Sequence, residues 1–329
     1  MVTLKDIALK VGVDISTVSK VLQGAPIRVS DAKRDQILRT AAELNYQPNV
    51  VARGLRLRKS GAIAMVVPTT TNYLYPEIIG GAEDAADEHG YILFLVKQSR
   101  SDPLQQLTSV VGQGRVDGLL FADDVPEPRF LDRLMEQKVP FISLNRMGTE
   151  DRRYVSLNDE AGFALQARHL VSLGHKSIVF VAVVPQSYVA RICQGFFEEA
   201  LRGSESQLHV LRCDFGGDDC NAVADQLLAL RPRPTAVAAA SVLVASRLVG
   251  ILRSRGVAVP EEISVIGYHD SPVAVWPPPG VTTVKMPSRL QGRRGVERLL
   301  EVIEGRDFPG EVLAEAPEIL ERGTCKKRE

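Results

Sequence analysis

The stretch TLKDIALKVGVDISTVSKVLQG, residues 3–24, decides the fold of the N-terminal region. Thr3 stands where a helix cap is favoured, and Gly12 stands where glycine commonly ends a helix. Between them, the apolar residues that recur at the spacing of one helix face are Leu4, Ile7, Ala8 and Val11. The stretch therefore predicts a short helix over residues 4–11, followed by a tight turn.

Two further helical segments follow this turn. Asp14 can cap a helix from Ile15 to about residue 23, and Ser30 can cap another from Asp31 to about residue 44. The residues expected to face inward are Val18, Val21 and Leu22 in the second helix, and Ile37, Leu38, Ala41 and Leu44 in the third. Two short helices joined by a glycine turn, with a third after them, predict a helix-turn-helix.

Charge is unevenly distributed along the chain. The whole protein is neutral, yet residues 1–60 hold eleven Lys or Arg against five Asp or Glu, and the remainder is acidic. A basic head on an acidic body indicates a polyanion as partner of the head alone. Residues 50–57 are too few and too polar to fold alone, so we expect them to order only against a partner.

Beyond Gly61, apolar strand-like runs alternate with helical patterns, which indicates βαβ units and parallel sheets. The predicted strands cover residues 62–67, 91–96, 118–122, 139–144, 177–183, 208–213, 236–240, 264–267 and 281–286. About nine strands and eight helices exceed one sheet. The pattern therefore predicts two α/β lobes that share a cleft.

Composition and motifs exclude several classes of protein. With 45% hydrophobic and 24% charged residues, the chain has the mix of a soluble globular protein. No apolar run reaches the length of a membrane span, and the charged N-terminus lacks a signal core, so we expect a cytoplasmic protein without a membrane role. The cysteines and histidines lack metal spacing, and no phosphate loop or paired nucleophile is present. We therefore expect no metal, no cofactor and no enzymatic activity.

Short motifs are spread over nearly the whole chain. In the head they are TLKDIA (3–8), TVSKVL (17–22), LNYQPN (44–49) and ARGL (52–55). In the body they include VDGLL (116–120), PTAV (234–237), VIGY (265–268) and PEILERGT (317–324). Their order and spacing resemble the LacI/GalR family of bacterial transcription regulators. The resemblance implies a homodimeric repressor of a catabolic or transport operon, bound to a near-palindromic operator in double-stranded DNA.

The resemblance also implies which head residues bind DNA. The second helix would enter the major groove, where Ile15, Ser16 and Lys20 would read bases. Thr17 and Ser19 suit phosphate oxygens, with capping and packing as the alternative. In a hinge helix over 50–57, Leu55 would wedge into the minor groove or, alternatively, pack on the body. The other residues that the resemblance assigns to DNA binding are Thr3, Asn49, Ala52, Arg53 and Arg56.

A small effector in the interlobe cleft is implied as well, but this chain departs from the family there. His269 and Val242 stand where the family usually has aspartates. The candidate effector residues are Tyr73, Tyr75, Arg146, Tyr188, Arg191, Ser241 and His269. Such a cleft suits an anionic or aromatic ligand better than a neutral sugar. A sugar, a sugar acid or another small anion stays open, as does a cleft that binds no small ligand and responds to a protein partner.

The resemblance divides the chain into a helix-turn-helix domain (1–48), a hinge helix and linker (49–60) and a two-lobed body (61–329). Lobe 1 is expected over about 61–159 and 291–316, and lobe 2 over about 160–290 and 317–324. Two rival classes fit less well. A periplasmic ligand-binding protein predicts a signal peptide and no basic head, and a Rossmann-like enzyme predicts a phosphate loop or catalytic cluster.

Overall fold

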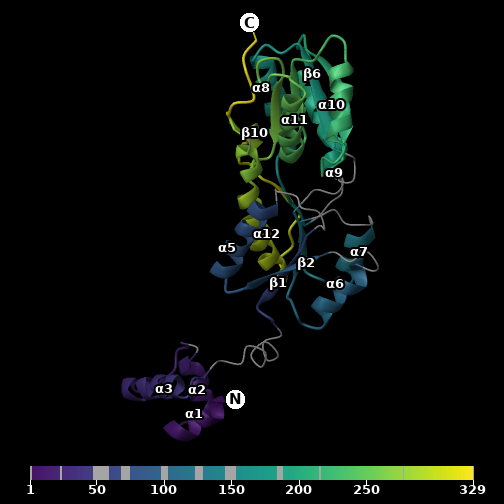
Figure 1. Ribbon diagram of the computed structural model, residues 1–329. Coiled ribbons are helices and arrows are strands. Elements are labelled where there is room, and N and C mark those ends of the chain that lie inside the picture. The colour runs from purple at the N-terminus through teal and green to yellow at the C-terminus, as the bar shows by residue number, and fades with distance from the viewer. Residues whose placement is uncertain are drawn as a thin grey trace. The chain divides into compact units, whose positions relative to one another are not determined.

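The structure is a computed structural model, drawn in Figure 1. It describes residues 2–22, 24–46, 59–67, 75–97, 103–122, 129–144, 153–183, 188–214, 216–276 and 278–328, with the backbone alone along 103–106, 129 and 188–191. The chain divides into two compact units, Met1–Arg58 and Lys59–Glu329, called here the head and the body.

The head holds three short helices, α1 (Leu4–Val11), α2 (Ile15–Leu22) and α3 (Asp31–Glu43). The Thr3 backbone N–H and hydroxyl both donate to Asp6 Oδ2, at 2.8 and 2.7 Å, which fixes the start of α1. Gly12 ends α1 in the left-handed conformation, at φ 69°. These local signals are the ones that the sequence predicted.

A small apolar core holds the head together. Ile7, Val11, Val18, Val21 and Ile37 are among its buried members, one set from each helix. The predicted inward position of Leu38 is wrong, because its side chain is 45% exposed. An α-helix turns about 100° per residue, so Leu38 points well away from the buried face that its neighbour occupies.

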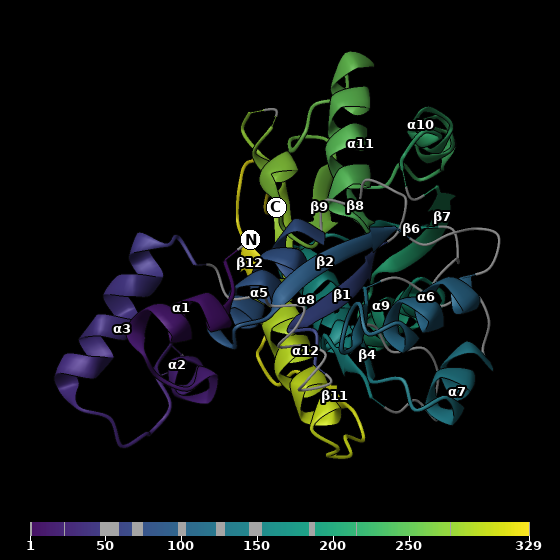
Figure 2. The same cartoon turned by 90° about the horizontal axis from the view of Figure 1, so that it is seen from below.

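Lobe 1 of the body is a four-stranded parallel sheet in the order β2-β1-β3-β4. Helices α5 and α12 bury one of its faces, and α6 and α7 bury the other (Figure 2). The elements are β1 (Ala62–Val67), β2 (Ile92–Lys97), β3 (Leu119–Phe121), β4 (Phe141–Ser143), α5 (Tyr75–Glu88), α6 (Pro103–Gly112), α7 (Arg129–Glu136) and α12 (Ser288–Ile303). Coverage on both faces explains why β1, β3 and β4 are continuous buried runs, whereas the edge strand β2 keeps several apolar side chains exposed.

Lobe 2 is a six-stranded sheet in the order β12-β10-β9-β8-β6-β7, in which only β12 is antiparallel. Helices α8 and α9 bury one face, and α10 and α11 the other. The elements are β6 (Ser177–Val183), β7 (Gln207–Cys213), β8 (Ala236–Ala239), β9 (Ser264–Tyr268), β10 (Thr282–Lys285), β12 (Glu318–Leu320), α8 (Asp159–Ser172), α9 (Tyr188–Leu201), α10 (Cys220–Ala229), α11 (Val242–Ser254) and the 3-10 turn η1 (Pro272–Val275).

The chain passes between the lobes after β5 (Val155–Ser156), after β10 and after β11 (Glu311–Val312). Strands β5 and β11 pair in parallel with each other. The buried Gln291 on α12 secures this region, because its Nε2 donates to the carbonyls of Leu144 and Val155. These two strands, β12 and η1 were not predicted from the sequence.

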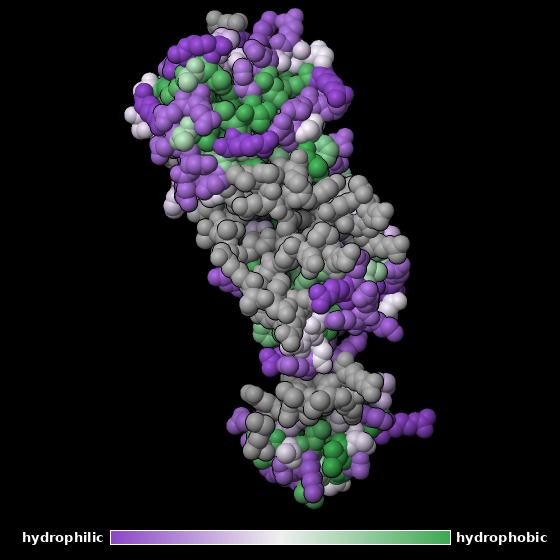
Figure 3. Space-filling view, turned by 90° about the vertical axis from the view of Figure 1, so that its right-hand side faces the viewer, coloured by the Kyte–Doolittle hydropathy of each residue, from purple (hydrophilic) through white to green (hydrophobic). Residues whose placement is uncertain are grey.

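The surface of the body is mixed. On the face that Figure 3 shows, apolar side chains gather on the lobe of the six-stranded sheet, with hydrophilic ones around them. Within the described ranges, no helix combines the length and the apolar character that a bilayer crossing requires.

Candidate functional site

Helix α2 turns its two faces to different environments. Val18 and Val21 are buried in the head core, which fixes the roll of the helix about its axis. Ile15 is 44% exposed, and Lys20 is exposed as well. Because its apolar face is held in the core, the helix presents an apolar residue and a cation on its other face. Both kinds of side chain can contact base edges in a major groove.

Ser16 and Asp14 organise the start of α2. The Ser16 backbone N–H donates to Asp14 Oδ1 at 2.7 Å. Hydrogen bonds from the Ser16 side chain and backbone hold the pKa of Asp14 below its usual value. Ser16 itself is exposed, and the oxygen of its hydroxyl can accept a hydrogen bond from a base edge.

The other predicted head residues have mixed settings. Thr17 and Ser19 are half-buried, so packing as well as phosphate contact fits them. Thr3 is exposed at the N-cap of α1. The predicted hinge-helix residues Asn49, Ala52, Arg53, Leu55 and Arg56 lie outside the described residues.

The body anchors its own first residues through one carboxylate. Asp117, two residues before β3, accepts from the Ser60 backbone N–H at 2.6 Å, from the Ser60 hydroxyl at 2.9 Å and from the Gly61 N–H at 3.0 Å. The linker that leads to the head therefore ends on a fixed point of lobe 1.

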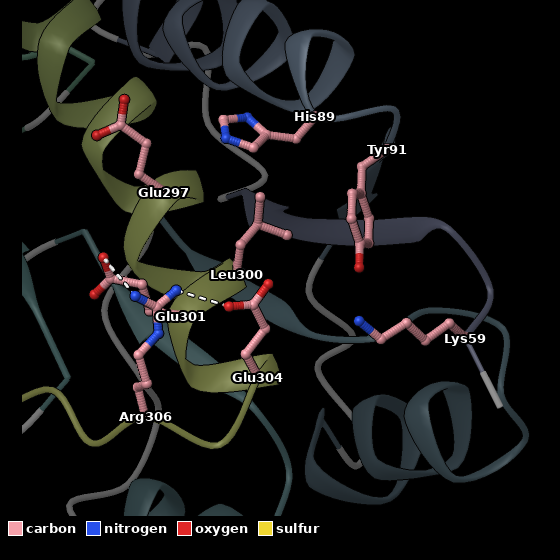
Figure 4. Close-up of a pocket in the computed structure, with 8 residues that line it drawn as sticks. All are labelled: Lys59, His89, Tyr91, Glu297, Leu300, Glu301, Glu304 and Arg306. Carbon is pink, nitrogen blue, oxygen red and sulfur yellow. Dashed lines mark hydrogen bonds and ion pairs between the residues drawn. The ribbon is translucent and has the colours of Figure 1, made fainter. Parts of the chain in front are cut away.

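A cavity of about 420 Å³ lies on lobe 1 next to this anchor (Figure 4). Lys59, the first residue of the body, points toward Tyr91, and the carboxylates of Glu301 and Glu304 form ion pairs with Arg306. The lining residues are Lys59, His89, Tyr91, Glu297, Leu300, Glu301, Glu304 and Arg306. None of the predicted effector residues lines this cavity.

Two predicted effector residues do meet at one edge of the lobe 2 sheet. The register pairs Ala239 with Gly267, so Ser241 and His269, each two residues further on, follow neighbouring strands. Ser241 is already engaged, because its Oγ caps α11 by accepting from the Leu243 N–H at 3.2 Å. The carboxyl ends of parallel strands are the usual place for a ligand, and both residues lie there.

His269 has an unusual backbone and an unusual environment. Its φ is 63°, in the left-handed region that few non-glycine residues adopt. Its Nδ1 is buried without a hydrogen-bond partner among the described residues, although the residue as a whole is half-buried. Burial lowers the pKa of His269 to about 4, so the ring is neutral at pH 7. It can accept or donate one hydrogen bond there but adds no positive charge.

The neighbouring carboxylate is occupied. Asp270 Oδ1 accepts from the Thr283 hydroxyl at 2.7 Å and pairs with Arg322 Nη1 at 2.8 Å. It therefore ties β9 to β10 and to the C-terminal segment. It does not replace the aspartate that the family usually has at the position of His269.

Sequence reasoning missed a second acidic group at this edge. The Tyr268 hydroxyl donates to Asp159 Oδ1 at 2.9 Å, and the Tyr268 ring stacks on Phe163 at 3.8 Å. Burial raises the pKa of Asp159 to about 6, against the hydrogen bond from Tyr268, which lowers it. The only available signal was the pair Asn158-Asp159 at a helix start, and 109 residues separate Asp159 from its partner.

The remaining predicted effector residues give less information. Tyr75 is half-buried at the first position of α5 and packs against the main core. Tyr188 and Arg191 lie in α9, where their side chains are not described, and Tyr73 and Arg146 lie outside the described residues.

Two family models match the chain. Residues 3–49 match "Bacterial regulatory proteins, lacI family", and residues 167–325 match "Periplasmic binding protein-like domain". The first covers the three head helices, and the second covers most of lobe 2.

Curated relatives and solved structures match over nearly the full length. An HTH-type transcriptional repressor PurR of Vibrio parahaemolyticus is 32% identical over 342 residues, with 99% of each chain covered. A lac repressor dimer bound to operator and the anti-inducer ONPF is 27% identical, with 99% of each chain covered and a TM-score of 0.86. A transcriptional regulator CelR in complex with cellobiose is 28% identical, with coverages of 98% and 100% and a TM-score of 0.74.

Proposed function

The chain belongs to the lacI family of bacterial regulatory proteins, and from this premise we propose that it represses transcription as a homodimer on a near-palindromic operator. The predicted family, the predicted fold class and the prediction of a DNA-binding regulator rather than an enzyme are confirmed by the comparisons. The domain limits 1–48, 49–60 and 61–329 are part of the proposal.

The observation that carries the proposal is the exposed face of α2. Ile15 and Lys20 stand outside a core that fixes the helix, and Ser16 offers an acceptor oxygen. Lys20 can donate to guanine O6 or N7, and Ile15 can contact a thymine methyl. Thr3, Thr17 and Ser19 would hold phosphates. By their position in the family motif, Leu55 would wedge into the minor groove, and Ala52 would contact the DNA. Asn49, Arg53 and Arg56 would hold phosphates or the floor of the groove.

Pairing of two protomers is supported by an exposed apolar edge. Strand β2 ends the four-stranded sheet, and its residues Ile92, Phe94 and Leu95 are exposed, Phe94 to 49%. Unpaired apolar edge strands favour association with another chain. Trp276, which is 76% exposed after η1, offers a second contact of this kind on lobe 2.

The dimer has a direct test. Phe94→Asp places a charge on the proposed pairing edge, and Phe94→Leu keeps it apolar. Sedimentation should show a dimer for the wild type and for Phe94→Leu, and a monomer for Phe94→Asp. A wild-type monomer at micromolar concentration would contradict the proposed pairing.

An effector would act through the ends of the lobe 2 strands. We place a small ligand beside Ser241 and His269, with Tyr73, Tyr75, Arg146, Tyr188 and Arg191 as the other candidate contacts. The two arginines and three tyrosines among these candidate contacts support an anionic or aromatic ligand over a neutral sugar, because Asp270 is already paired with Arg322. Calorimetry with sugars, sugar acids, phosphates and aromatic acids tests this preference, and tight binding of a neutral sugar would overturn it.

A second candidate follows from the same observation. In this alternative the edge binds no small ligand, because Ser241 caps α11 and Asp270 pairs with Arg322. The protein then responds to DNA alone or to a protein partner. Calorimetry without heat from any of the four ligand classes would favour this alternative.

Repression itself is tested in cells. Short genomic fragments from the source bacterium are placed before a reporter, and the full chain is co-expressed. We expect some fragments whose reporter signal falls with the wild type and recovers with Lys20→Ala. A signal that rises instead would contradict repression. The proposed location is the cytoplasm, where bacterial DNA lies.

A further inference from the structure

Two buried thiols meet at one end of lobe 2. Cys213 is the last residue of β7, Cys220 is the first residue of α10, and their Sγ atoms are 3.5 Å apart. The side chains of both are buried. The two cysteines are seven positions apart in the sequence, and this spacing gave no sign of their contact.

Cys220 has the surroundings of a reactive thiol. It stands at the N-terminus of a ten-residue helix, where unpaired backbone N–H groups favour a thiolate. Gly217 allows Arg247 to approach, because a Cβ there would lie 2.9 Å from Arg247 Cδ and 3.2 Å from Cys220 Sγ. The hydrogen bond with Cys213 and, more weakly, the charge of Arg247 lower the pKa of Cys220, against burial and the carboxylates nearby.

Cys213 is the partner that keeps its proton. Its Sγ lies 2.9 Å from Asp219 Oδ1 and 3.5 Å from Cys220 Sγ, so its one proton is shared between these two acceptors. The contact with Cys220, burial and Asp219 all raise the pKa of Cys213. The pair is therefore asymmetric, with one thiol prone to ionise and one held neutral beside a carboxylate.

A resident metal fits this cluster less well. Cys213, Asp214 and Asp219 each place one candidate ligand atom within 4.8 Å of the others. However, Asp219 Oδ1 already accepts from the Asp214 N–H at 2.9 Å, and Asp214 Oδ1 accepts from the Asp218 N–H at 2.7 Å. These oxygens organise the turn between β7 and α10, whereas the two sulfur atoms contact each other.

We propose that Cys220 is a site of oxidation by small hydroperoxides and that Cys213 resolves it as an intramolecular disulfide. The Cys220 thiolate attacks one oxygen of hydrogen peroxide, the O–O bond breaks, and a sulfenic acid and hydroxide form. The Cys213 sulfur then attacks the Cys220 sulfur, and the sulfenic oxygen leaves as water with the Cys213 proton. In sum, two thiols and one peroxide give one disulfide and two waters.

Closure needs a local movement only. The Sγ atoms must approach from 3.5 Å to about 2.05 Å, the length of a disulfide. Cys213 is in register with Val183, the last residue of β6, so the disulfide would form at the same edge of the sheet as Ser241 and His269. Because both thiols are buried, hydrogen peroxide should react faster than a bulky aromatic disulfide reagent.

The test uses the full-length reduced protein and dilute hydrogen peroxide. Remaining thiols are alkylated, and the intact mass and peptides are measured. We expect loss of two hydrogens, one linked peptide joining Cys213 to Cys220, and recovery with dithiothreitol. Cys193 and Cys325 should stay reduced, and so be alkylated once the protein is unfolded, because burial raises the pKa of each to about 12 and a protonated thiol reacts poorly with peroxide. Four free thiols after treatment, or a disulfide through Cys193 or Cys325, would overturn the proposal.

Variants separate the roles of the two thiols. In Cys213→Ser, peroxide should leave a sulfenic acid on Cys220 that a dimedone probe captures. In Cys220→Ser, no disulfide should form, and Cys325→Ser should behave as the wild type. Capture at Cys213 of Cys220→Ser, with none at Cys220 of Cys213→Ser, would overturn the assignment. Even where a variant fails to fold, the peptide map of the wild type shows whether a disulfide joins Cys213 to Cys220.

Arg247 has a matched control. It pairs with Asp218, in the turn before α10, at 2.9 Å, while Arg255, at the end of α11, pairs with Asp225 of α10 at 2.6 Å and is not among the charges that shift the pKa of Cys220. Arg247→Ala should slow oxidation of Cys220 about two- to fivefold by reducing its thiolate fraction, and Arg255→Ala should not. Equal rates in the two variants would overturn the role assigned to Arg247.

Discussion

The head and the carboxyl edge of the lobe 2 sheet use polar side chains in opposite ways. On α2, a buried apolar face leaves Ile15 and Lys20 free to meet a partner. At the sheet edge, Ser241 caps a helix and Asp270 pairs with Arg322. The exposed side chains of α2 are available to contact a DNA groove. At the sheet edge, Ser241 and Asp270 already make hydrogen bonds and an ion pair within the protein. We therefore expect α2 to recognise DNA with the side chains as they stand, and we expect the sheet edge to accept few kinds of effector.

The largest expected effect is unfolding of the head without unfolding of the body. Val18→Asp buries an unpaired charge in the head core, which should destabilise the head by more than about 3 kcal/mol. Operator binding should be lost. Calorimetry should still show the unfolding transition of the body, whose core is separate. Leu9→Asp, on the exposed face of α1, is the control. A body transition that shifts with Val18→Asp would contradict the independence of the two units.

A smaller effect sharpens the assignment of α2. Lys20→Ala should weaken operator binding about 5- to 150-fold, or about 1–3 kcal/mol, and relax the preference at one base pair of each half-site. Lys10→Ala removes an exposed lysine that pairs with Glu43 at 3.1 Å and serves as the control. Gel-shift titrations with point-substituted duplexes measure both. Equal losses in the two variants would mean that Lys20 supplies charge only.

The anchor of the linker should matter less than a base contact. Asp117→Ala removes the acceptor for Ser60 and Gly61, so the lobe no longer fixes the linker. We expect operator affinity to fall about three- to tenfold, since a few uncompensated hydrogen bonds are involved. Asp87→Ala, at an exposed position of α5, should leave it unchanged. Unaltered affinity in Asp117→Ala would show that the anchor plays no part in DNA binding.

The last effect acts on stability rather than on DNA affinity and concerns pH at the sheet edge. The pKa of His269 is about 4 in the folded protein and lies below the usual value near 6.5, so protonation favours unfolding. Stability should therefore fall as the pH drops from about 6.5 toward 4, by at most about 1.4 kcal/mol per pH unit for this group. His269→Asn, which tolerates the positive φ, should reduce that slope.

Urea titrations from pH 7.5 to 4.5 measure the slope for wild type and variant. His175, whose pKa burial also lowers to about 4, should preserve part of it in both proteins. His89→Asn, at an exposed histidine, is the control. A slope that His269→Asn leaves unchanged would contradict the buried, neutral state of this ring.

The parts of the fold that the sequence predicted are those with local signals. The strand Ser177–Val183 is buried on both faces, so seven apolar or small residues in a row identify it. The three head helices carry caps and a periodic apolar face. In contrast, β5, β11 and β12 contain two or three residues, and pairing with distant strands creates them. The prediction that Leu38 is buried was wrong because two consecutive apolar residues cannot both lie on one narrow helix face.

The candidate site residues likewise fall into those that local sequence signals could identify and those that they could not. Ile15 and Lys20 could be assigned from one helix, because their exposure depends on neighbours three or four residues away. The bonds of Asp270 to Thr283 and Arg322, the contact of Asp159 with Tyr268, and the thiol pair join segments that only the tertiary fold brings together. No spacing in the sequence encodes these contacts.

Selection of DNA by the full-length wild-type protein tests the central claim most directly. The protein is offered a pool of random duplexes at low ionic strength, and bound sequences are read after several rounds. The account predicts enrichment of one near-palindromic sequence, which Lys20→Ala binds more weakly and less selectively. Recovery of no preferred sequence, or of one that the Val18→Asp variant binds equally well, would contradict recognition of an operator by α2.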